Sequence, residues 1–221
     1  MLRHTVAVLA AGIAVAGCSS KATTTHPSTP NPVPGSALDG LFPAVGDVNA
    51  VMGTTMTPHE SISMTRDHSE LLPNLNCLGI WQVGEKTIYD PSGYAAIRGQ
   101  VLREPDTDSW DSLVVQAVLS YPAADAAKKF FAESVDRWSH CSNHQVTMTQ
   151  SGHSQITLTF GSLTKTDTEL TMSVSSSGGG ASCQRALGVD NNLIIDVSAC
   201  GHSITNQASS LVSKIETRIP A

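Results

Sequence analysis

The sequence predicts an α+β domain in which helices pack on an antiparallel β-sheet. Strand-length runs rich in β-branched residues fill the second half of the chain and are separated by turn residues. Three other stretches place apolar residues at helical spacing, near the start, in the middle and at the end. The resulting order of helix, strands, helix, strands and helix is typical of α+β domains.

The chain begins with the features of a secretory signal peptide. A basic start precedes an uncharged apolar stretch over 5–16, which is too short to span a bilayer as a helix. The stretch ends in Val-Ala-Gly-Cys18, which resembles the bacterial lipobox, whose cysteine is acylated after the signal is cut before it. We therefore predict removal of residues 1–17 and a lipid, such as palmitate, on Cys18. This places the protein at the outer face of the cell membrane.

A tether is expected next. Residues 18–37 are rich in Ser, Thr and Pro and offer few apolar side chains to bury, so they are predicted to be extended and flexible. The apolar pattern starts at Leu38, and residues 38–221 are assigned to one domain.

The first half of this domain is predicted to hold one short helix and four strands. The helix covers 41–52 and ends at Gly53, a residue suited to a left-handed C-cap. An irregular segment is expected over 54–76. The four strands are expected at 77–83, 86–89, 94–102 and 112–121, and the last is the most apolar, as in a central strand.

A long helix separates these strands from a second set. Residues 122–140 begin with a proline and carry one apolar face. A final helix, capped by Ser203, carries another. Between them an antiparallel meander is predicted, with strands at 144–149, 155–160, 169–175, 181–187 and 193–199.

Four cysteines remain when Cys18 is set aside, and an even number in an exported chain indicates disulfides. Asn191-Asn192 is a tight-turn pair between two strands, and this turn places Cys183 opposite Cys200 at a non-hydrogen-bonded site, where side chains approach closely. A Cys183–Cys200 bridge is therefore predicted. It leaves Cys77 to pair with Cys141.

Composition excludes some classes of function. The formal net charge is -6, charged residues make up 14% of the chain, and no basic stripe is present, so nucleic-acid binding is not expected. No pair of cysteines has the spacing of a zinc site, and no metal or other cofactor is predicted.

Several short motifs come near known sites but depart from them. Gly152–Ile156 resembles a nucleophile elbow but ends in isoleucine, where that turn needs glycine. His140 and His144 have a metal-binding spacing without the glutamate of a zincin. Asp106–Asp111 lacks the glycine and the distant glutamate of a calcium loop, and Ser175–Gly180 lacks the lysine of a phosphate-binding loop. Turns and exposed surface explain them better.

A set of aromatic residues with one arginine is the candidate binding site. Amphipathic rings and a guanidinium can line a cleft for an apolar or anionic ligand, although core packing is the competing explanation for each ring. The candidate residues are Trp81, Tyr89, Tyr94, Arg98 and Trp110.

An ordered set of motifs is similar to the PknH-like extracellular sensor domain family of mycobacterial kinases and lipoproteins. The likeness covers about residues 38–218. The matching motifs are Leu41-Phe-Pro through Val51-Met-Gly53, Cys77, Gln116-Ala-Val-Leu-Ser-Tyr-Pro122-Ala-Ala-Asp-Ala126, Phe130-Phe131, Trp138-Ser-His-Cys141, Cys183-Gln-Arg-Ala-Leu187 and Asn191-Asn-Leu-Ile-Ile-Asp-Val197 with Cys200.

The resemblance implies an antiparallel sheet with flanking helices, two disulfides and a cleft for an extracytoplasmic ligand, without enzymatic activity. The chain departs from the kinases in lacking a kinase domain and a membrane-spanning helix, so a signal is not expected to pass inward through the same polypeptide. We therefore expect a lipid-anchored, monomeric binding domain that recognises a small molecule or an envelope component. The alternative is a protein-interaction module without a ligand pocket.

Overall fold

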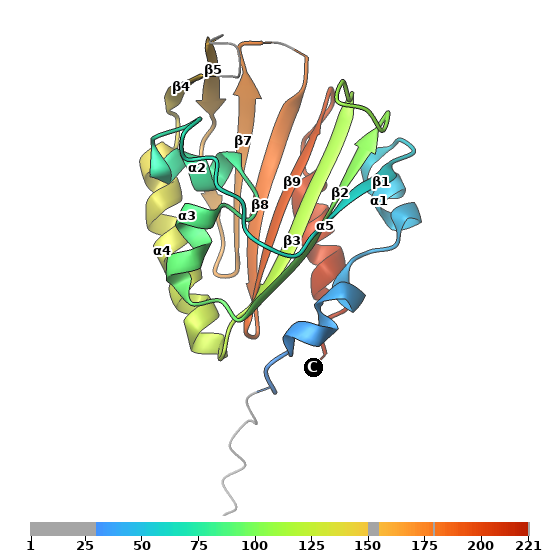
Figure 1. The fold of residues 1–221 in the computed structure, drawn as a ribbon, viewed down its shortest axis with the longest axis vertical. Coiled ribbons are helices and arrows are strands. Elements are labelled where there is room, and N and C mark those ends of the chain that lie inside the picture. Colours follow the sequence, from blue (N-terminus) through green and yellow to red (C-terminus); the bar gives the residue numbers. More distant parts are fainter. Residues whose placement is uncertain (1–29, 150–154, 179, 221) are drawn as a thin grey trace, which may run out of the picture.

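An antiparallel β-sheet of nine strands organises the computed structural model, which describes residues 30–149, 155–178 and 180–220 (Figure 1). The helices are the 3-10 helices η1 (Gly35–Leu41) and η2 (Asp90–Ser92) and the α-helices α1 (Val45–Met52), α2 (Leu75–Trp81), α3 (Lys86–Tyr89), α4 (Ala124–Cys141) and α5 (Gln207–Glu216). The strands are β1 (Thr57–Ile62), β2 (Ala96–Glu104), β3 (Ser112–Ser120), β4 (Gln145–Thr149), β5 (Gln155–Phe160), β6 (Thr164–Lys165), β7 (Glu169–Ser176), β8 (Ser182–Asp190) and β9 (Leu193–Gly201). The predicted α+β class is confirmed.

The strands lie in the order β1-β2-β3-β9-β8-β7-β5-β4, and the short β6 pairs with β7 outside this path. The second half of the chain forms the predicted meander, which ends when β9 inserts beside β3. Gly53 has φ of 71° and ends α1 as a left-handed C-cap. The most apolar strand, β3, lies inside the sheet between β2 and β9, as predicted.

Two predicted strands are helices. The segments predicted as strands at 77–83 and 86–89 form α2 and α3. The Asn74 side chain accepts hydrogen bonds from the N–H groups of Asn76 and Cys77, which caps α2, and Glu85 caps α3 through the N–H of Thr87. Periodicity alone does not separate a short buried strand from a short buried helix, and here the caps decide.

Two strands were not predicted, and the last helix starts later than predicted. The segment predicted to be irregular contains β1, whose residues are mostly exposed because it is an edge strand. The short strand β6 was not predicted. The last helix begins after Asn206 rather than at Ser203, because the amide oxygen of Gln207 accepts from the N–H groups of Thr205 and Asn206 and holds the preceding segment as a turn.

The domain includes residues that the sequence assigned to the tether. Val33 is buried; its N–H donates to the side-chain oxygen of Asn192 at 2.7 Å, and its carbonyl accepts from Asn192 Nδ2 at 3.1 Å. The same Nδ2 donates to the carbonyl of Tyr121 at 2.7 Å. Asn191, beside it, has φ of 49°, which Asn tolerates. The described chain therefore starts against the β8–β9 turn.

The sheet has two covered faces. The face that packs on α2 and α4 is called the front face, and the face that packs on η1, α1 and α5 is called the back face. Each carries its own core of buried residues, the front one including Phe130 and Ile194 and the back one including Leu211 and Ile195. Alternation along β9 sends successive side chains to opposite faces.

Two disulfides link the elements as predicted. Cys77–Cys141 joins α2 to the last residue of α4, with 5.3 Å between the Cα atoms. Cys183–Cys200 joins β8 to β9 at the pair that the turn register predicts. The first bridge holds two front helices together, and the second holds two central strands together.

Candidate ligand-binding site

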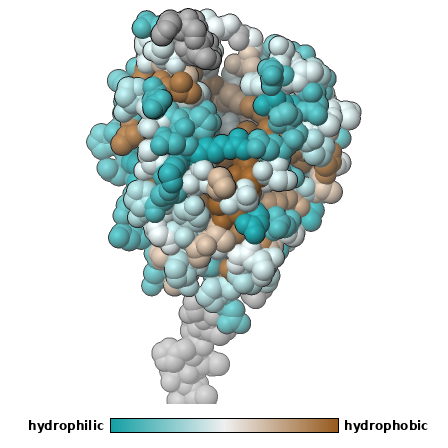
Figure 2. Space-filling view, in the orientation of Figure 1, coloured by the Kyte–Doolittle hydropathy of each residue, from teal (hydrophilic) through white to brown (hydrophobic). Residues whose placement is uncertain are grey.

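One end of the front face is hollowed. A cavity of about 350 Å³ opens there, and Figure 2 shows a recess with hydrophobic walls near the top of the molecule. Its volume is in the range of small-molecule sites, roughly 300–1,000 Å³. Apolar side chains from β3, β5 and β7 line the walls: Leu113, Val115, Ile156, Leu158 and Val174.

The β8–β9 hairpin forms the floor of the cavity. Cys183 and Cys200 lie opposite each other on this floor, and Arg185 and Ser198 form the next pair on the same face. The bridged Cα atoms are 4.0 Å apart, the close approach of a non-hydrogen-bonded pair. The disulfide therefore fixes the spacing of the two strands at the cavity.

Two tryptophans line the cavity. Trp81 is the last residue of α2, and Trp110 comes from the loop between β2 and β3. Both rings are partly exposed. Two of the five residues predicted to bind ligand therefore lie together at the cavity, although one comes from a helix and the other from a loop.

The other three predicted residues lie elsewhere. Tyr89 is buried in α3 and stacks on Phe130, with 4.8 Å between the ring centroids. Tyr94 packs against the front core without lining the cavity. Arg98 is on the back face of β2, with its Nε 3.4 Å from a carboxylate oxygen of Asp39. The sequence grouped these residues by proximity along the chain, and the fold separates them.

A buried ion pair lies beside the floor. Arg185 and Asp196 have side chains that are 1% and 0% exposed, and Arg185 Nη2 donates to Asp196 Oδ1 at 2.5 Å. Arg185 Nε donates to the carbonyl of Ile80, and its Nη2 reaches the carbonyl of Gly79 at 3.4 Å. These carbonyls belong to the last turn of α2, which lacks intrahelical partners for them. Arg185 thus fixes the helix end that carries Trp81.

Asp196 secures the connection between α2 and α3. Its Oδ2 accepts from the N–H of Gly84 at 3.0 Å and from the hydroxyl of Tyr89 at 2.8 Å. Burial, and after it the neighbouring Asp196 carboxylate, raises the pKa of the Tyr89 phenol well above its ordinary value. Tyr89 therefore stays protonated and continues to donate. Both carboxylate oxygens of Asp196 are occupied by protein donors.

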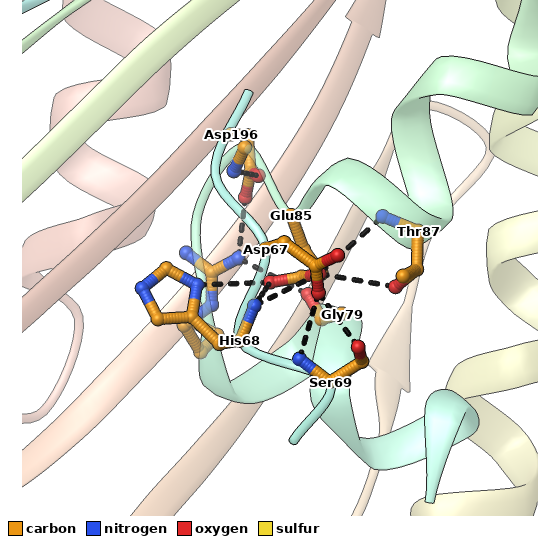
Figure 3. Close-up of polar contacts among 9 residues, drawn as sticks. Asp67, His68, Ser69, Gly79, Glu85, Thr87 and Asp196 are labelled. Carbon is orange, nitrogen blue, oxygen red and sulfur yellow. Dashed lines mark hydrogen bonds and ion pairs between the residues drawn. The ribbon is translucent and has the colours of Figure 1, made fainter. Parts of the chain in front are cut away.

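A second buried carboxylate holds the same connection from outside (Figure 3). Glu85 is fully buried and accepts from the backbone N–H and the ring Nδ1 of His68, the latter at 3.0 Å, and from the hydroxyl of Thr87 at 3.0 Å. His68 belongs to the segment that crosses the front of the sheet between β1 and α2 (Figure 1). Gln82 and Val83, which line the cavity, are therefore held on both sides.

Sequence reasoning missed Arg185 and Asp196. A signal was present, since each is a lone charge in an otherwise apolar strand run. The turn register pairs Arg185 with Ser198, two residues from Asp196, so the two charges lie diagonally on one face. A buried ion pair in the hairpin could have been predicted from that register.

Other predicted features have different outcomes. Gly152–Ser154 and Cys18 lie outside the described residues. Among the residues that are described, no group of three His, Cys, Asp or Glu side chains is arranged to hold a metal ion. No helix in the same part of the chain is long and apolar enough to cross a membrane.

The nine-stranded sheet, its flanking helices and two disulfides define a disulfide-bonded α+β domain of the kind that occurs in oxidising compartments. The family described as "PknH-like extracellular domain" matches residues 33–218, and the chain belongs to this family. The predicted resemblance is therefore confirmed over nearly the whole described region.

Relatives and a solved structure agree with this assignment. The chain is 35% identical over 193 residues to the serine/threonine-protein kinase PknH of Mycobacterium bovis, covering 86% of this chain and 32% of the relative. The same identity relates it to PknH of Mycobacterium tuberculosis H37Rv, of which it covers 30%. The chain thus spans about a third of the length of these relatives. The crystal structure of the extracellular domain of M. tuberculosis PknH superposes with a TM-score of 0.80 at 34% identity, covering 85% of this chain and 97% of that one.

Proposed function

We propose that the protein is a non-catalytic extracytoplasmic binding domain that recognises a small molecule or an envelope component in the front-face cavity. The observation that carries this proposal is the cavity of about 350 Å³, which combines apolar walls with a few polar groups on its floor. Such a combination is typical of sites for small ligands. Membership of an extracellular domain family supports the location of the site outside the cytoplasm.

In this proposal Trp81 and Trp110 contact the ligand. Trp110 is partly exposed and belongs to neither core, so its replacement is not expected to disturb core packing. Trp81 packs against the front core on one side and lines the cavity on the other. Flat amphipathic rings at a cavity supply large contact areas at a small cost in side-chain entropy.

The test is a search for bound compounds followed by a change at the cavity. The purified chain is incubated with an extract of the cell envelope, and compounds that stay bound are identified by mass spectrometry, with the thermal midpoint as a second readout. We expect retained compounds and a raised midpoint. Trp110→Ala should reduce both with little effect on the unliganded protein.

Arg98→Gln is the matched control, because Arg98 was predicted at the site but lies on the back face. It should bind as the unchanged chain does. If no extract component stays bound or protects the protein, the small-ligand proposal fails. Retention of an envelope protein instead, unaffected by Trp110→Ala, would support the alternative of a protein-interaction module.

We also propose that Cys18 carries a lipid anchor. The support is the lipobox-like Val-Ala-Gly-Cys18 after an apolar run. Cys18→Ala should leave the domain folded and move it from the membrane fraction to the soluble fraction. Recovery of the Cys18→Ala chain in the detergent phase, at the level of the unchanged chain, would refute the anchor.

A further inference from the structure

Strand β3 is covered along only part of its front face. Ala117 and Leu119 are fully buried there, whereas Leu113 and Val115, further towards the cavity on the same face, are partly exposed. Both exposed side chains line the cavity. An interior strand with uncovered aliphatic side chains leaves apolar surface in water, which is unfavourable, and a contiguous surface of this kind is typical of binding grooves.

The same aliphatic chemistry continues on the far side of the β8–β9 hairpin. Because β3 lies beside β9 and β7 lies beside β8, the hairpin separates two apolar rows. The second row consists of Val174 from β7 with Ile156 and Leu158 from β5, and Ile156 is partly exposed like the residues of β3. These walls appear as the hydrophobic surface of the recess in Figure 2. Aliphatic side chains offer contact area without directional partners.

The polar groups of the cavity do not favour a charged ligand. Arg185 is the one charged residue at the lining among those that the structure describes, and its side chain is 1% exposed and paired with Asp196. Ser198 is 7% exposed, and its Oγ lies 3.6 Å from Cys200 Sγ. A ligand charge buried between the walls would therefore lose its hydration without meeting an unpaired counter-charge.

We propose that the cavity takes the uncharged hydrocarbon chain of a lipid-like compound and leaves any polar head of that compound at the mouth, in water. The cavity of about 350 Å³ has room for roughly ten carbon atoms, since a water molecule, which is close to a methylene group in size, takes about 30 Å³. This assignment rests on the proposed ligand-binding function and specifies the chemical class of the ligand.

The first test measures how binding depends on chain length. The full chain with Cys18→Ala is titrated with hexanol, octanol and decanol, and binding is followed through the amide NMR signals of residues at the cavity. Each added methylene group should tighten binding about fourfold, because it is transferred from water to an apolar site. Equal affinity for the three alcohols would overturn the assignment.

The second test compares head groups at one chain length. Octanoate and protonated octylamine should bind with similar affinity, because neither charge meets an unpaired partner in the cavity. A preference of about tenfold or more for one sign at physiological salt would overturn the assignment. Maltose tests the other class of ligand that tryptophans accommodate. Binding of maltose at the cavity without binding of the alcohols would contradict the hydrocarbon class and keep the ligand-binding function.

A matched pair of variants places the chain in the cavity. Val115→Thr keeps the shape of a cavity wall residue and adds a hydroxyl group, which should weaken octanol binding by about fivefold or more. Val146→Thr makes the same change in β4, at a residue that is also partly buried against the front core but does not line the cavity. It should bind as the unchanged chain does. Equal effects of the two variants would overturn the assignment. If neither these compounds nor any component of an envelope extract shifts a signal at the cavity, small-ligand binding itself is contradicted.

Discussion

The two faces of strand β9 differ in chemistry along one continuous segment. Side chains on its back face pack under α5 and are all buried and apolar: Leu193, Ile195, Val197 and Ala199. Side chains on its front face include two polar groups between an apolar start and the disulfide at the cavity: Ile194, Asp196, Ser198 and Cys200. Both sets of side chains are buried, so the degree of burial does not explain why polar residues occur on the front face alone.

The back face of β9 contributes mainly to the stability of the fold, and the front face mainly positions the residues around the cavity. The back face gains from apolar burial, which is non-directional and tolerates conservative exchange. The front face contains directional contacts, in which Asp196 and Arg185 fix the end of α2 and the chain that follows it. Four changes, taken from the largest expected effect to the smallest, test this separation.

Asp196→Ala should have the largest effect. It leaves Arg185 buried without its counter-charge, and breaking one partner of such a pair costs about 3–5 kcal/mol of the free energy of unfolding. Urea denaturation measures the loss. The double variant Arg185→Met with Asp196→Leu should recover most of it, because an apolar replacement of a whole buried pair is often close to neutral. A double variant as unstable as Asp196→Ala would show that the directional contacts themselves stabilise the fold.

Removal of the floor disulfide should come next. The double variant Cys183→Ala with Cys200→Ala opens a loop that spans a sequence separation of 17 residues, and the expected loss is about 3 kcal/mol. Urea denaturation under non-reducing conditions measures it. Amide exchange should increase at the cavity end of β8 and β9 and change little in α5. Equal increases on both faces would contradict the separation.

Ile195→Val should have a smaller effect, although it is adjacent to Asp196. The residue loses one methylene group in the back core, at a cost of about 1 kcal/mol. The binding of compounds retained from the envelope extract should be unchanged, because the side chain of Ile195 points away from the cavity. A change in binding larger than the change in stability would show that the two faces are coupled.

Glu216→Gln should have the smallest effect and should stabilise. Burial, and after it the charges of Asp190 and Glu169, raises the pKa of Glu216 above its ordinary value of 4.5. Below that value both the folded and unfolded states bind the proton, so the glutamate makes no difference. As the pH rises through the raised pKa, the folded state loses stability, and the loss is complete above it.

The substitution should therefore gain less than about 1 kcal/mol at pH 7, because the side chain is partly exposed, and nothing near pH 4. Denaturation at the two pH values measures this difference. Glu70→Gln, at an exposed position outside the back face, is the control. An equal gain at both pH values would contradict the electrostatic cause.

Local sequence signals predicted much of the sheet. Asn191-Asn192 placed Cys183 opposite Cys200, because a tight turn determines the register of the strands beside it. The apolar face of α4 was equally clear from spacing. The segments that form α2 and α3 were misassigned, since each is shorter than the window in which helical and strand periods separate.

The cavity was harder to predict than the sheet. Trp81 and Trp110 meet there because Arg185 holds the end of α2 against the sheet while the β2–β3 loop approaches from the other side. The spacing of Trp81 and Trp110 along the chain does not predict that they line the same cavity. Tyr89, Tyr94 and Arg98 were included because they are close in sequence, yet alternation and helix formation direct them away from the cavity.

The Asn192 turn and the cavity lie at opposite ends of strand β9. Strand β9 starts beside Val33 and runs to the cavity floor at Cys200, about 23 Å away at about 3.3 Å per residue. With the proposed anchor on Cys18, the predicted flexible tether would join the domain at the turn end, which is the end of β9 away from the cavity floor.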